Sequence, residues 1–229
     1  MLNKIITDVF FDLDHTLWDF DKNSGLAFQR VFRKHEIDIP LPDFLKVYEP
    51  INLEYWRMFR EERVTKQELR RGRLSKTFDV LAFKYTIDLI DLLANSYIDE
   101  LPGDNYLFSN TFETLDYLSG KYRLHIITNG FEEVQRKKID NSGLKKYFLT
   151  ITTSEEVGLK KPHPTVFYTA MEKASVTPDK SIMIGDSFEA DILGAQNAGM
   201  HTLFYNYRNE AVKKPFIAVK ELSEIKDYL

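Results

Sequence analysis

Two carboxylates stand two residues apart near the start of the chain, directly after an apolar run. Asp12 and Asp14 follow residues 5–11, whose Ile, Val and Phe side chains are typical of a buried strand. One carboxylate can attack phosphorus as a nucleophile, while a second donates a proton to the departing oxygen and later activates water. The pair could supply these two carboxylates of a phosphoryl transfer; the simpler alternative is a pair of aspartates in a solvated turn.

Three further polar clusters follow later apolar runs. They are Thr128-Asn129-Gly130, Lys160-Lys161-Pro162, and Gly185-Asp186-Ser187 with Asp191 after it. In a doubly wound sheet the ligand binds outside the carboxyl ends of the strands, so we expect these clusters to meet Asp12 and Asp14. The alternatives are ordinary turns at Thr128 and Asn129, an N-cap at Asp186-Ser187, and a first-turn acid at Asp191.

Each cluster supplies a part that phosphoryl transfer requires. Thr128, Asn129 and a lysine of the third cluster would hold the phosphate, and the chemistry alone leaves Lys160 and Lys161 both open. Asp12, Asp14 and Asp186 are hard oxygen ligands suited to Mg²⁺. That ion would screen the repulsion between an anionic nucleophile and an anionic phosphate. Magnesium is therefore the expected cofactor.

Length and composition bound the alternatives. The chain has 229 residues with a formal net charge of −4, so a nucleic acid polymer is not an expected partner. It contains no cysteine, which excludes disulfides, thiolate zinc sites and cysteine nucleophiles. No apolar run is long enough for a membrane span, and no signal peptide is visible. We expect a cytoplasmic protein that acts on a small phosphorylated metabolite.

Hydrophobic periodicity predicts an α/β fold that carries a helical insertion. Residues 18–98 have helical patterns and almost no strand signal, whereas alternating strand and helix patterns follow Leu101-Pro102-Gly103. We therefore expect a Rossmann-like core, residues 1–17 and 99–229, with a parallel sheet, and an all-helical domain over 18–98. Predicted strands are 5–11, 124–128, 148–152, 181–184 and 202–205, and predicted helices include 111–118, 164–174 and 190–197.

The four clusters, in this order, resemble the haloacid dehalogenase superfamily of phosphohydrolases. The resemblance implies that Asp12 is the nucleophile, Asp14 the acid/base, and Asp186 a magnesium ligand. It further implies that Thr128 and Lys161 bind phosphate and that the backbone carbonyl of Asp14 completes the magnesium shell. Supporting positions would be Thr16, Ser187 and Asp191. The chain departs from the common pattern at His15, where many members carry glycine, so the turn after Asp14 must accept a side chain.

The helical insertion resembles the cap of the subclass whose cap follows the DxD strand, and such a cap would close over the phosphate. Residues 127–131 and 154–162, with the patterns 55–56, 64–65 and 69–73, are similar to the pyrimidine 5′-nucleotidases of the superfamily. This implies hydrolysis of pyrimidine nucleoside 5′-monophosphates such as dUMP, UMP and dTMP. Candidates for stacking on the base are Trp18, Phe20, Tyr55 and Trp56, although a helical domain also needs aromatic core residues.

Other functions use the same residues. A sugar-phosphate or phosphoglycolate phosphatase would need the same core chemistry. A catalytically silent binding module is the alternative from another class. The basic residues between Arg63 and Lys76 fit a solvated face better than an anion-steering surface, and His35, His125, His163 and His201 show no ligand spacing. We expect a monomer or a weak homo-oligomer.

Overall fold

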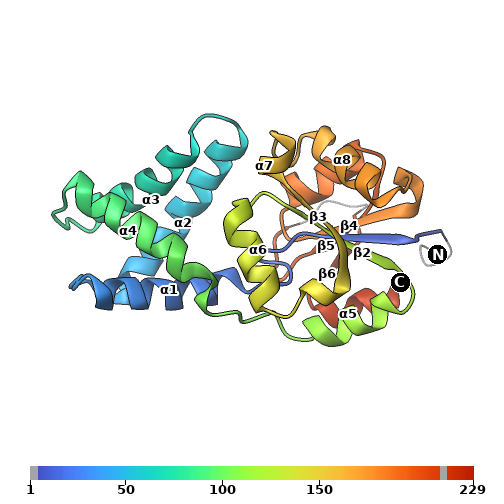
Figure 1. Cartoon of the computed structure of the whole chain (residues 1–229), viewed down its shortest axis with the longest axis horizontal. Coiled ribbons are helices and arrows are strands. Elements are labelled where there is room, and N and C mark those ends of the chain that lie inside the picture. Colours follow the sequence, from blue (N-terminus) through green and yellow to red (C-terminus); the bar gives the residue numbers. More distant parts are fainter. Residues whose placement is uncertain (1–4, 212–215) are drawn as a thin grey trace. The chain divides into compact units, whose positions relative to one another are not determined.

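The computed structural model describes residues 5–211 and 216–229 and divides the chain into two compact units. One unit comprises the chain up to Phe20 and from Asn105 onwards, and the other comprises Asp21–Asp104. The first is an α/β unit and the second is helical, which confirms the predicted fold class (Figure 1).

A six-stranded parallel sheet organises the α/β unit, with the strand order β3-β2-β1-β4-β5-β6. Its strands are β1 (Asp8–Phe11), β2 (Arg123–Thr128), β3 (Phe148–Thr153), β4 (Ser181–Gly185), β5 (His201–Tyr205) and β6 (Ala218–Val219). All four residues of β1 and all five of β4 are buried. Buried central strands of this kind need helices on both faces of the sheet.

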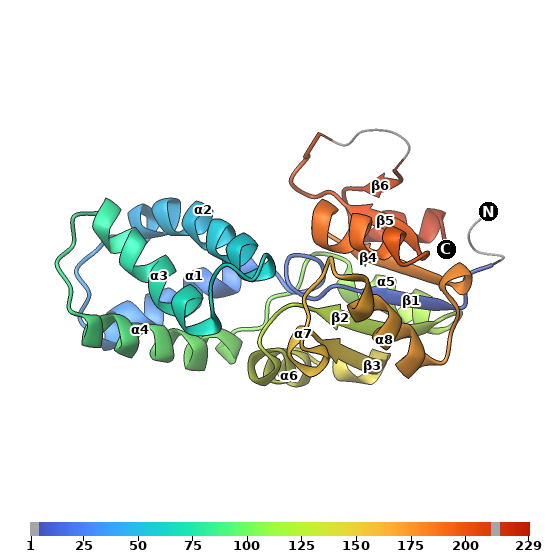
Figure 2. The same ribbon diagram turned by 90° about the horizontal axis from the view of Figure 1, so that it is seen from above.

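Helices cover both faces of this sheet (Figures 1 and 2). They are α5 (Thr111–Ser119), α6 (Glu132–Asn141), α7 (Ser154–Val157), α8 (Pro164–Ala174) and α9 (Gly194–Asn197), with 3₁₀ turns at Lys145–Tyr147, Pro178–Lys180 and Leu222–Asp227. Helix α8 packs on β2 and β3, whereas α5 packs on β2 and the C-terminal 3₁₀ turn on the opposite side. Since β2 lies on one side of β1 and β4 on the other, the sheet reverses its winding at β1, where ligands bind in such folds.

The turn that follows β1 is tightly closed on itself. The backbone N–H groups of Leu17 and Trp18 both donate to the carbonyl of Leu13, at 3.0 and 2.9 Å. His15 adopts a left-handed backbone with φ of 62°, so the turn accepts a side chain where glycine would be unstrained. Trp18 forms bridges to Asp14 and Leu107, and therefore belongs to the α/β unit, whereas we expected the helical domain to begin at that residue.

The helical unit contains α2 (Leu41–Arg60), α3 (Lys66–Val80), α4 (Ile87–Glu100), most of α1 (Phe20–Lys34) and a 3₁₀ turn at Leu101–Gly103 (Figure 2). A capping box starts α3, because the Thr65 hydroxyl accepts from the Glu68 N–H at 3.2 Å and the Glu68 carboxylate accepts from the Thr65 N–H at 2.7 Å. Aromatic rings fill the core of this unit, with Phe28 stacked on Tyr97 at 4.2 Å.

Two sequence-based boundaries differ from the structure. The first strand covers 8–11 rather than 5–11. In place of one helix over 190–197, the chain forms a π-helical turn, Phe188–Leu193, followed by α9. The carbonyl of Ser187 accepts from both Asp191 N–H and Ile192 N–H, at 2.9 and 3.3 Å, which widens this turn. None of the helices in the described ranges combines the length and the apolar character needed to cross a bilayer.

Candidate active site

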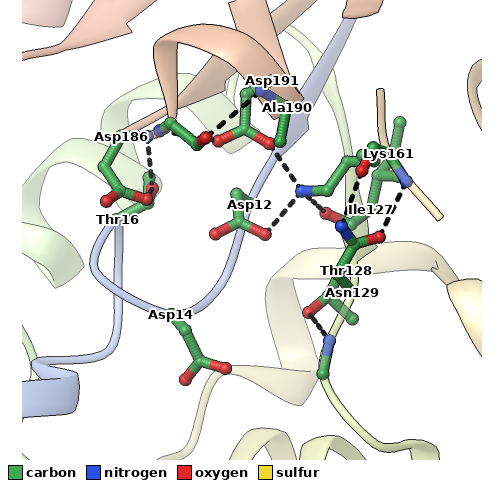
Figure 3. Close-up of polar contacts among 12 residues, drawn as sticks. Asp12, Asp14, Thr16, Ile127, Thr128, Asn129, Lys161, Asp186, Ala190 and Asp191 are labelled. Atoms are coloured by element: carbon green, nitrogen blue, oxygen red, sulfur yellow. Dashed lines mark hydrogen bonds and ion pairs between the residues drawn. The ribbon is translucent and has the colours of Figure 1, made fainter. Parts of the chain in front are cut away.

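The site residues come together where three neighbouring strands end (Figure 3). Asp12 follows β1, Thr128 closes β2, and Asp186 follows β4. Parallel pairing aligns Phe11 with Ile184, and the backbone N–H of Asp12 donates to the Ile184 carbonyl at 2.9 Å. The sheet register therefore places the segments of Asp12 and Asp186 side by side.

The ammonium group of Lys161 is the buried centre of this arrangement. Its Nζ lies 2.7 Å from Asp12 Oδ1 and 2.6 Å from Asp191 Oδ1, and it donates to the Ile127 carbonyl at 2.8 Å. The side chain is 2% exposed. The ammonium group donates hydrogen bonds to Asp12 Oδ1 and to the Ile127 carbonyl, and it forms an ion pair with the carboxylate of Asp191. Lys161, rather than its neighbour Lys160, is the lysine at the site.

Asn129 holds the backbone of Lys161. Its Oδ1 accepts from the Lys161 N–H at 2.8 Å, and its Nδ2 donates to the Lys161 carbonyl at 2.9 Å. Asn129, which we expected to contact phosphate, uses one donor and one acceptor position of its amide in this pair of bonds, and its contact with phosphate stays a prediction. The residue therefore positions the lysine segment beside β2.

Three carboxylates lie close enough to share one cation. Asp12, Asp186 and Asp191 each offer an oxygen, and these atoms lie within 4.8 Å of one another. Burial and the neighbouring carboxylates of Asp191 and Asp14 raise the pKa of Asp12 to about 7, against the lowering effect of Lys161. Burial and the charges of Asp12 and Asp191 raise the pKa of Asp186 well above its usual range. This excess of buried negative charge and the hard oxygen donors fit Mg²⁺.

Gly185 and Ser187 allow Asp191 to reach this group. A Cβ at Gly185 would stand 2.3 Å from Asp191 Oδ2, so any side chain there would displace the carboxylate. The Ser187 N–H donates to the same oxygen at 3.0 Å, while the Ser187 hydroxyl accepts from Ala190 N–H at 3.2 Å. Ser187 thus caps the π-helical turn, as the alternative interpretation of this motif predicts, and at the same time orients Asp191.

Thr16 links the first and last motifs. Its hydroxyl accepts from the Asp186 N–H at 3.1 Å, and the same hydroxyl lies 3.5 Å from Asp186 Oδ1. The side chain is fully buried. The threonine of the first motif therefore supports the segment that carries Asp186, across 170 residues of sequence.

The carboxylate of Asp14 points away from the other three, toward α6 (Figure 3). Lys138 Nζ lies 2.6 Å from Asp14 Oδ1, and Gln135 Nε2 donates to Asp14 Oδ2 at 2.9 Å. The carboxylates that lie together among the described residues are those of Asp12, Asp186 and Asp191, rather than those of Asp12, Asp14 and Asp186. The backbone carbonyl of Asp14 as a magnesium ligand stays a prediction. Asp14 lies two residues from Asp12 in a turn, and that turn sends the two side chains in different directions.

Arg208, like Gln135 and Lys138, is a site residue that the motifs did not predict. It lies just beyond β5, and its NH1 donates to Asp186 Oδ2 at 3.1 Å while its NH2 donates to His15 Nδ1 at 2.9 Å. Burial and the positive charges of Arg208 and Lys138 lower the pKa of His15 well below its usual range, so its neutral ring is an acceptor. Extending the search for polar residues to the end of the strand predicted over 202–205 would have found Arg208. Gln135 and Lys138 had a weaker signal, their spacing of three residues on one helix face.

The four residues expected to stack on a base separate into two pairs. Trp18 and Phe20 are buried, and their ring centroids lie 4.0 and 5.1 Å from the ammonium of Lys138. Both rings contact this cation, and their stacking on a base stays a prediction. Tyr55 and Trp56 are partly exposed on α2 of the helical unit.

Comparisons with known proteins agree with these motifs. The family model of haloacid dehalogenase-like hydrolases matches residues 9–205. Pyrimidine 5′-nucleotidase YjjG of Escherichia coli is 32% identical over 229 residues, 96% of each chain. A glyceraldehyde 3-phosphate phosphatase of Methanothermobacter thermautotrophicus is 30% identical over 230 residues, 96% of this chain and 98% of that one.

A solved structure is similar over the whole chain. The HAD-hydrolase YfnB of Bacillus subtilis, solved bound to magnesium, superposes with a TM-score of 0.88 at 28% identity, covering 97% of this chain and 98% of that chain. The resemblance drawn from the sequence motifs is therefore confirmed. The chain belongs to the haloacid dehalogenase-like hydrolase family.

Proposed function

We propose that this protein is a magnesium-dependent phosphomonoesterase that hydrolyses nucleoside 5′-monophosphates, pyrimidine nucleotides preferred, through an aspartyl phosphate. One observation carries the chemistry. Asp12 stands at the end of β1 with Lys161 on Oδ1 at 2.7 Å and two further carboxylates within 4.8 Å. Asp12 is thus a nucleophile that lies beside the ammonium group of Lys161 and beside two carboxylates that could bind Mg²⁺ with it.

Asp12 attacks phosphorus through its second oxygen. Within the described part of the chain, the hydrogen bond to the Asp12 carboxylate goes to Oδ1, from Lys161. Oδ2 is therefore the atom that forms the bond to phosphorus as the ester oxygen leaves. Lys161 keeps the carboxylate in one rotamer and offsets its charge. A bound Mg²⁺ would neutralise negative charge on the nucleophile and the phosphoryl oxygens.

Asp14 moves the protons. In its acid form it gives a proton to the departing alkoxide, and as a carboxylate it then accepts one from the water that attacks the aspartyl phosphate. Water reaches it, because its side chain is 21% exposed while that of Lys138 is 1% exposed. The two aspartates thus divide the work, with Asp12 bonded to phosphorus and Asp14 exchanging protons.

Thr128 offers a hydrogen to the phosphate. Its hydroxyl oxygen accepts from the Gly130 N–H at 3.1 Å and from Gln135 Nε2 at 2.7 Å. A threonine hydroxyl has two acceptor positions and one hydrogen, so both acceptor positions are occupied and the hydrogen remains for a ligand. Its place at the end of β2 sets that hydrogen beside the Lys161 segment, since the Ile127 carbonyl binds Lys161.

Similarity to a pyrimidine 5′-nucleotidase over nearly the full chain supports the substrate, together with the motif resemblance. Hydrolysis of a small sugar phosphate such as glyceraldehyde 3-phosphate is the second candidate, favoured by a relative of nearly equal identity and coverage. The core chemistry is the same in both cases, so the leaving group distinguishes them.

The test is phosphate release from UMP, dUMP, dTMP, AMP, glyceraldehyde 3-phosphate and phosphoglycolate, with Mg²⁺ and with chelator. Asp12→Asn is the blank for contaminating phosphatase. We expect magnesium-dependent release with the highest kcat/KM for a pyrimidine nucleotide. A preference for glyceraldehyde 3-phosphate or phosphoglycolate would overturn the substrate and leave the chemistry standing. No release from any compound would favour a silent binding module.

A further inference from the structure

The carboxylate of Asp14 is held by two side chains of one helix. Lys138 Nζ lies 2.6 Å from Oδ1, and Gln135 Nε2 lies 2.9 Å from Oδ2. The two residues are three positions apart on α6, so they project from the same face. Each oxygen of the carboxylate therefore has its own donor.

Gln135 also joins Asp14 to the phosphate-binding loop. The same Nε2 that donates to Asp14 donates to Thr128 Oγ1 at 2.7 Å. The loop is shaped for this contact, because a Cβ at Gly130 would stand 2.3 Å from the Gln135 amide carbon. The buried amide of Gln135 thus fixes the distance between Asp14 and Thr128.

Two aromatic rings also contact the ammonium group of Lys138. Its side chain is 1% exposed, and the rings of Trp18 and Phe20 lie 4.0 and 5.1 Å from Nζ. Burying an ammonium group costs free energy unless it is paired, and Asp14 is the anion that pairs with it here. Both rings follow Asp14 closely in sequence, so the segment that carries Asp14 also builds the cage for its partner.

We propose that Gln135 and Lys138 are positioning residues that hold the Asp14 carboxylate at the angle and distance from which it exchanges protons at the ester oxygen and the attacking water. The inference rests on the proposed function, in which Asp14 is the acid/base. It adds two residues outside the four motifs, and it gives α6 a part in the reaction. A displacement of about 1 Å at a reacting group costs on the order of 10²-fold in rate.

The leaving group provides a readout that a merely structural role would not move. The alkoxide of a nucleoside monophosphate needs a proton to depart, whereas p-nitrophenolate departs without one. Loss of Asp14 positioning should therefore slow formation of the aspartyl phosphate from UMP, or from whichever alkyl ester the panel selects, and spare its formation from p-nitrophenyl phosphate. General damage to the site would slow both reactions equally.

The experiment compares single-turnover rates on the two esters for Lys138→Met, Gln135→Leu and the control Lys137→Met. Lys137 is an exposed lysine on the same helix. For Lys138→Met we expect a loss of about 10²-fold on the alkyl ester, with the p-nitrophenolate burst rate within about 3-fold of the original protein. Gln135 also binds the Thr128 hydroxyl, so Gln135→Leu should slow both esters, and the alkyl ester more than p-nitrophenyl phosphate. The control should match the original protein on both esters. Thermal melts establish that each variant is folded, and Lys138→Arg replaces Lys138→Met if the latter is not.

Asp14→Asn, measured in parallel, distinguishes a failure of the positioning role from a failure of the acid/base assignment of Asp14. If Asp14→Asn shows the selective loss and the α6 variants do not, the positioning role is overturned and the proposed function stands. Equal losses on both esters in the α6 variants also overturn the positioning role. If Asp14→Asn itself shows no selectivity for the alkyl ester, the acid/base assignment fails, and the inference fails with it.

Discussion

The two units of this protein bury charge in different ways. In the α/β unit, buried charges have partners of opposite sign: Asp8 contacts Arg123 at 2.9 Å, Lys138 contacts Asp14, and Lys161 contacts both Asp12 and Asp191. In the helical unit, residues 21–104, all of which the structure describes, Arg73 is the buried side chain that carries a charge. Its contacts are neutral, with Asn52 Oδ1 at 2.9 Å and the ring of Tyr97 at 5.0 Å.

This difference indicates which of the two units carries the catalytic groups. An ion pair is costly to bury, and replacing one by apolar residues is often neutral or stabilising, so ion pairs are weak devices for stability. The ion pairs of Asp12 and Asp14 follow the end of β1, which indicates groups kept for catalysis, whereas Asp8 and Arg123 begin β1 and β2 at the opposite edge of the sheet. The helical unit is stabilised by aromatic packing, for example Phe28 against Tyr97 and Phe44 against Tyr48. We therefore expect its substitutions to change stability or leaving-group preference and to leave the chemical step intact.

Replacing the nucleophile should give the largest effect. Asp12→Asn removes the atom that bonds to phosphorus, and we expect the turnover of every substrate to fall by about 10⁴-fold or more. Stability should change little, since Asp191 still pairs with Lys161. Phosphate release and a thermal melt measure the two outcomes. Retained turnover would refute Asp12 as the nucleophile.

Removing the central cation should destabilise the α/β unit. Lys161→Met leaves Asp12 and Asp191 buried without their partner, at a cost of about 3 kcal/mol at pH 8. The lost cation had lowered the pKa of Asp12, so that pKa rises further above its unfolded value, and the stability of the variant should fall as the pH rises from 6 to 8. Urea unfolding, followed by Trp18 fluorescence in a Trp56→Phe background, measures this. A pH-independent loss would contradict the electrostatic explanation.

Magnesium affinity should depend on pH. Asp12 has a pKa raised to about 7, so a proton competes with the ion below that pH. The Mg²⁺ dissociation constant should be about ten-fold larger at pH 6 than at pH 8. Calorimetry in two buffers of different ionisation enthalpy would show the released proton. Equal affinity at both pH values would place the ion away from Asp12.

A substitution in the helical unit should affect one substrate class alone. Trp56 is partly exposed on α2, and its replacement by leucine should lower kcat/KM for a pyrimidine nucleotide by about 5-fold through lost ring stacking. The value for glyceraldehyde 3-phosphate should not change. Leu53→Ala, at an exposed position of the same helix, is the matched control. A parallel loss on both substrates would argue against base recognition by Trp56.

The smallest effect should come from Arg73, the buried cation of the helical unit. Arg73→Met leaves no carboxylate unpaired, and Arg73 Nε has no hydrogen-bond partner among the described residues. We expect the free energy of unfolding of the helical unit to change by less than about 1 kcal/mol. Trp56 fluorescence in a Trp18→Phe background measures it. A loss as large as that of Lys161→Met would remove the contrast between the units.

The motifs predicted much of the site because each of them is a local pattern. Asp12, Thr128, Lys161 and Asp186 all follow or close apolar runs, and the rule that ligands bind at the carboxyl ends of parallel strands predicts that they meet. The strands over 124–128, 148–152 and 181–184 were found nearly to their observed bounds. Periodicity located the helical segment, although Trp18 at its predicted start packs in the α/β unit.

The local sequence motifs did not predict the directions in which the side chains point. The contacts of the Asp14 carboxylate with α6 and of the Asn129 amide with the Lys161 backbone were not predicted. Trp18 and Phe20 were two of four candidates for stacking on a base, and the contact of both rings with Lys138 was not predicted. In each of these contacts the two residues lie far apart in the sequence. A local sequence pattern therefore cannot predict the contact.

The sequence by itself determined the fold class, the family and the residues that end the central strands, because strand periodicity and short motifs depend on neighbours along the chain. Only the tertiary structure decided which carboxylates face one another and which side chains hold them. After β1, the carboxylate of Asp12 pairs with Lys161 and the carboxylate of Asp14 pairs with Lys138 of α6. Those contacts join residues more than 120 positions apart, and packing in three dimensions sets their geometry.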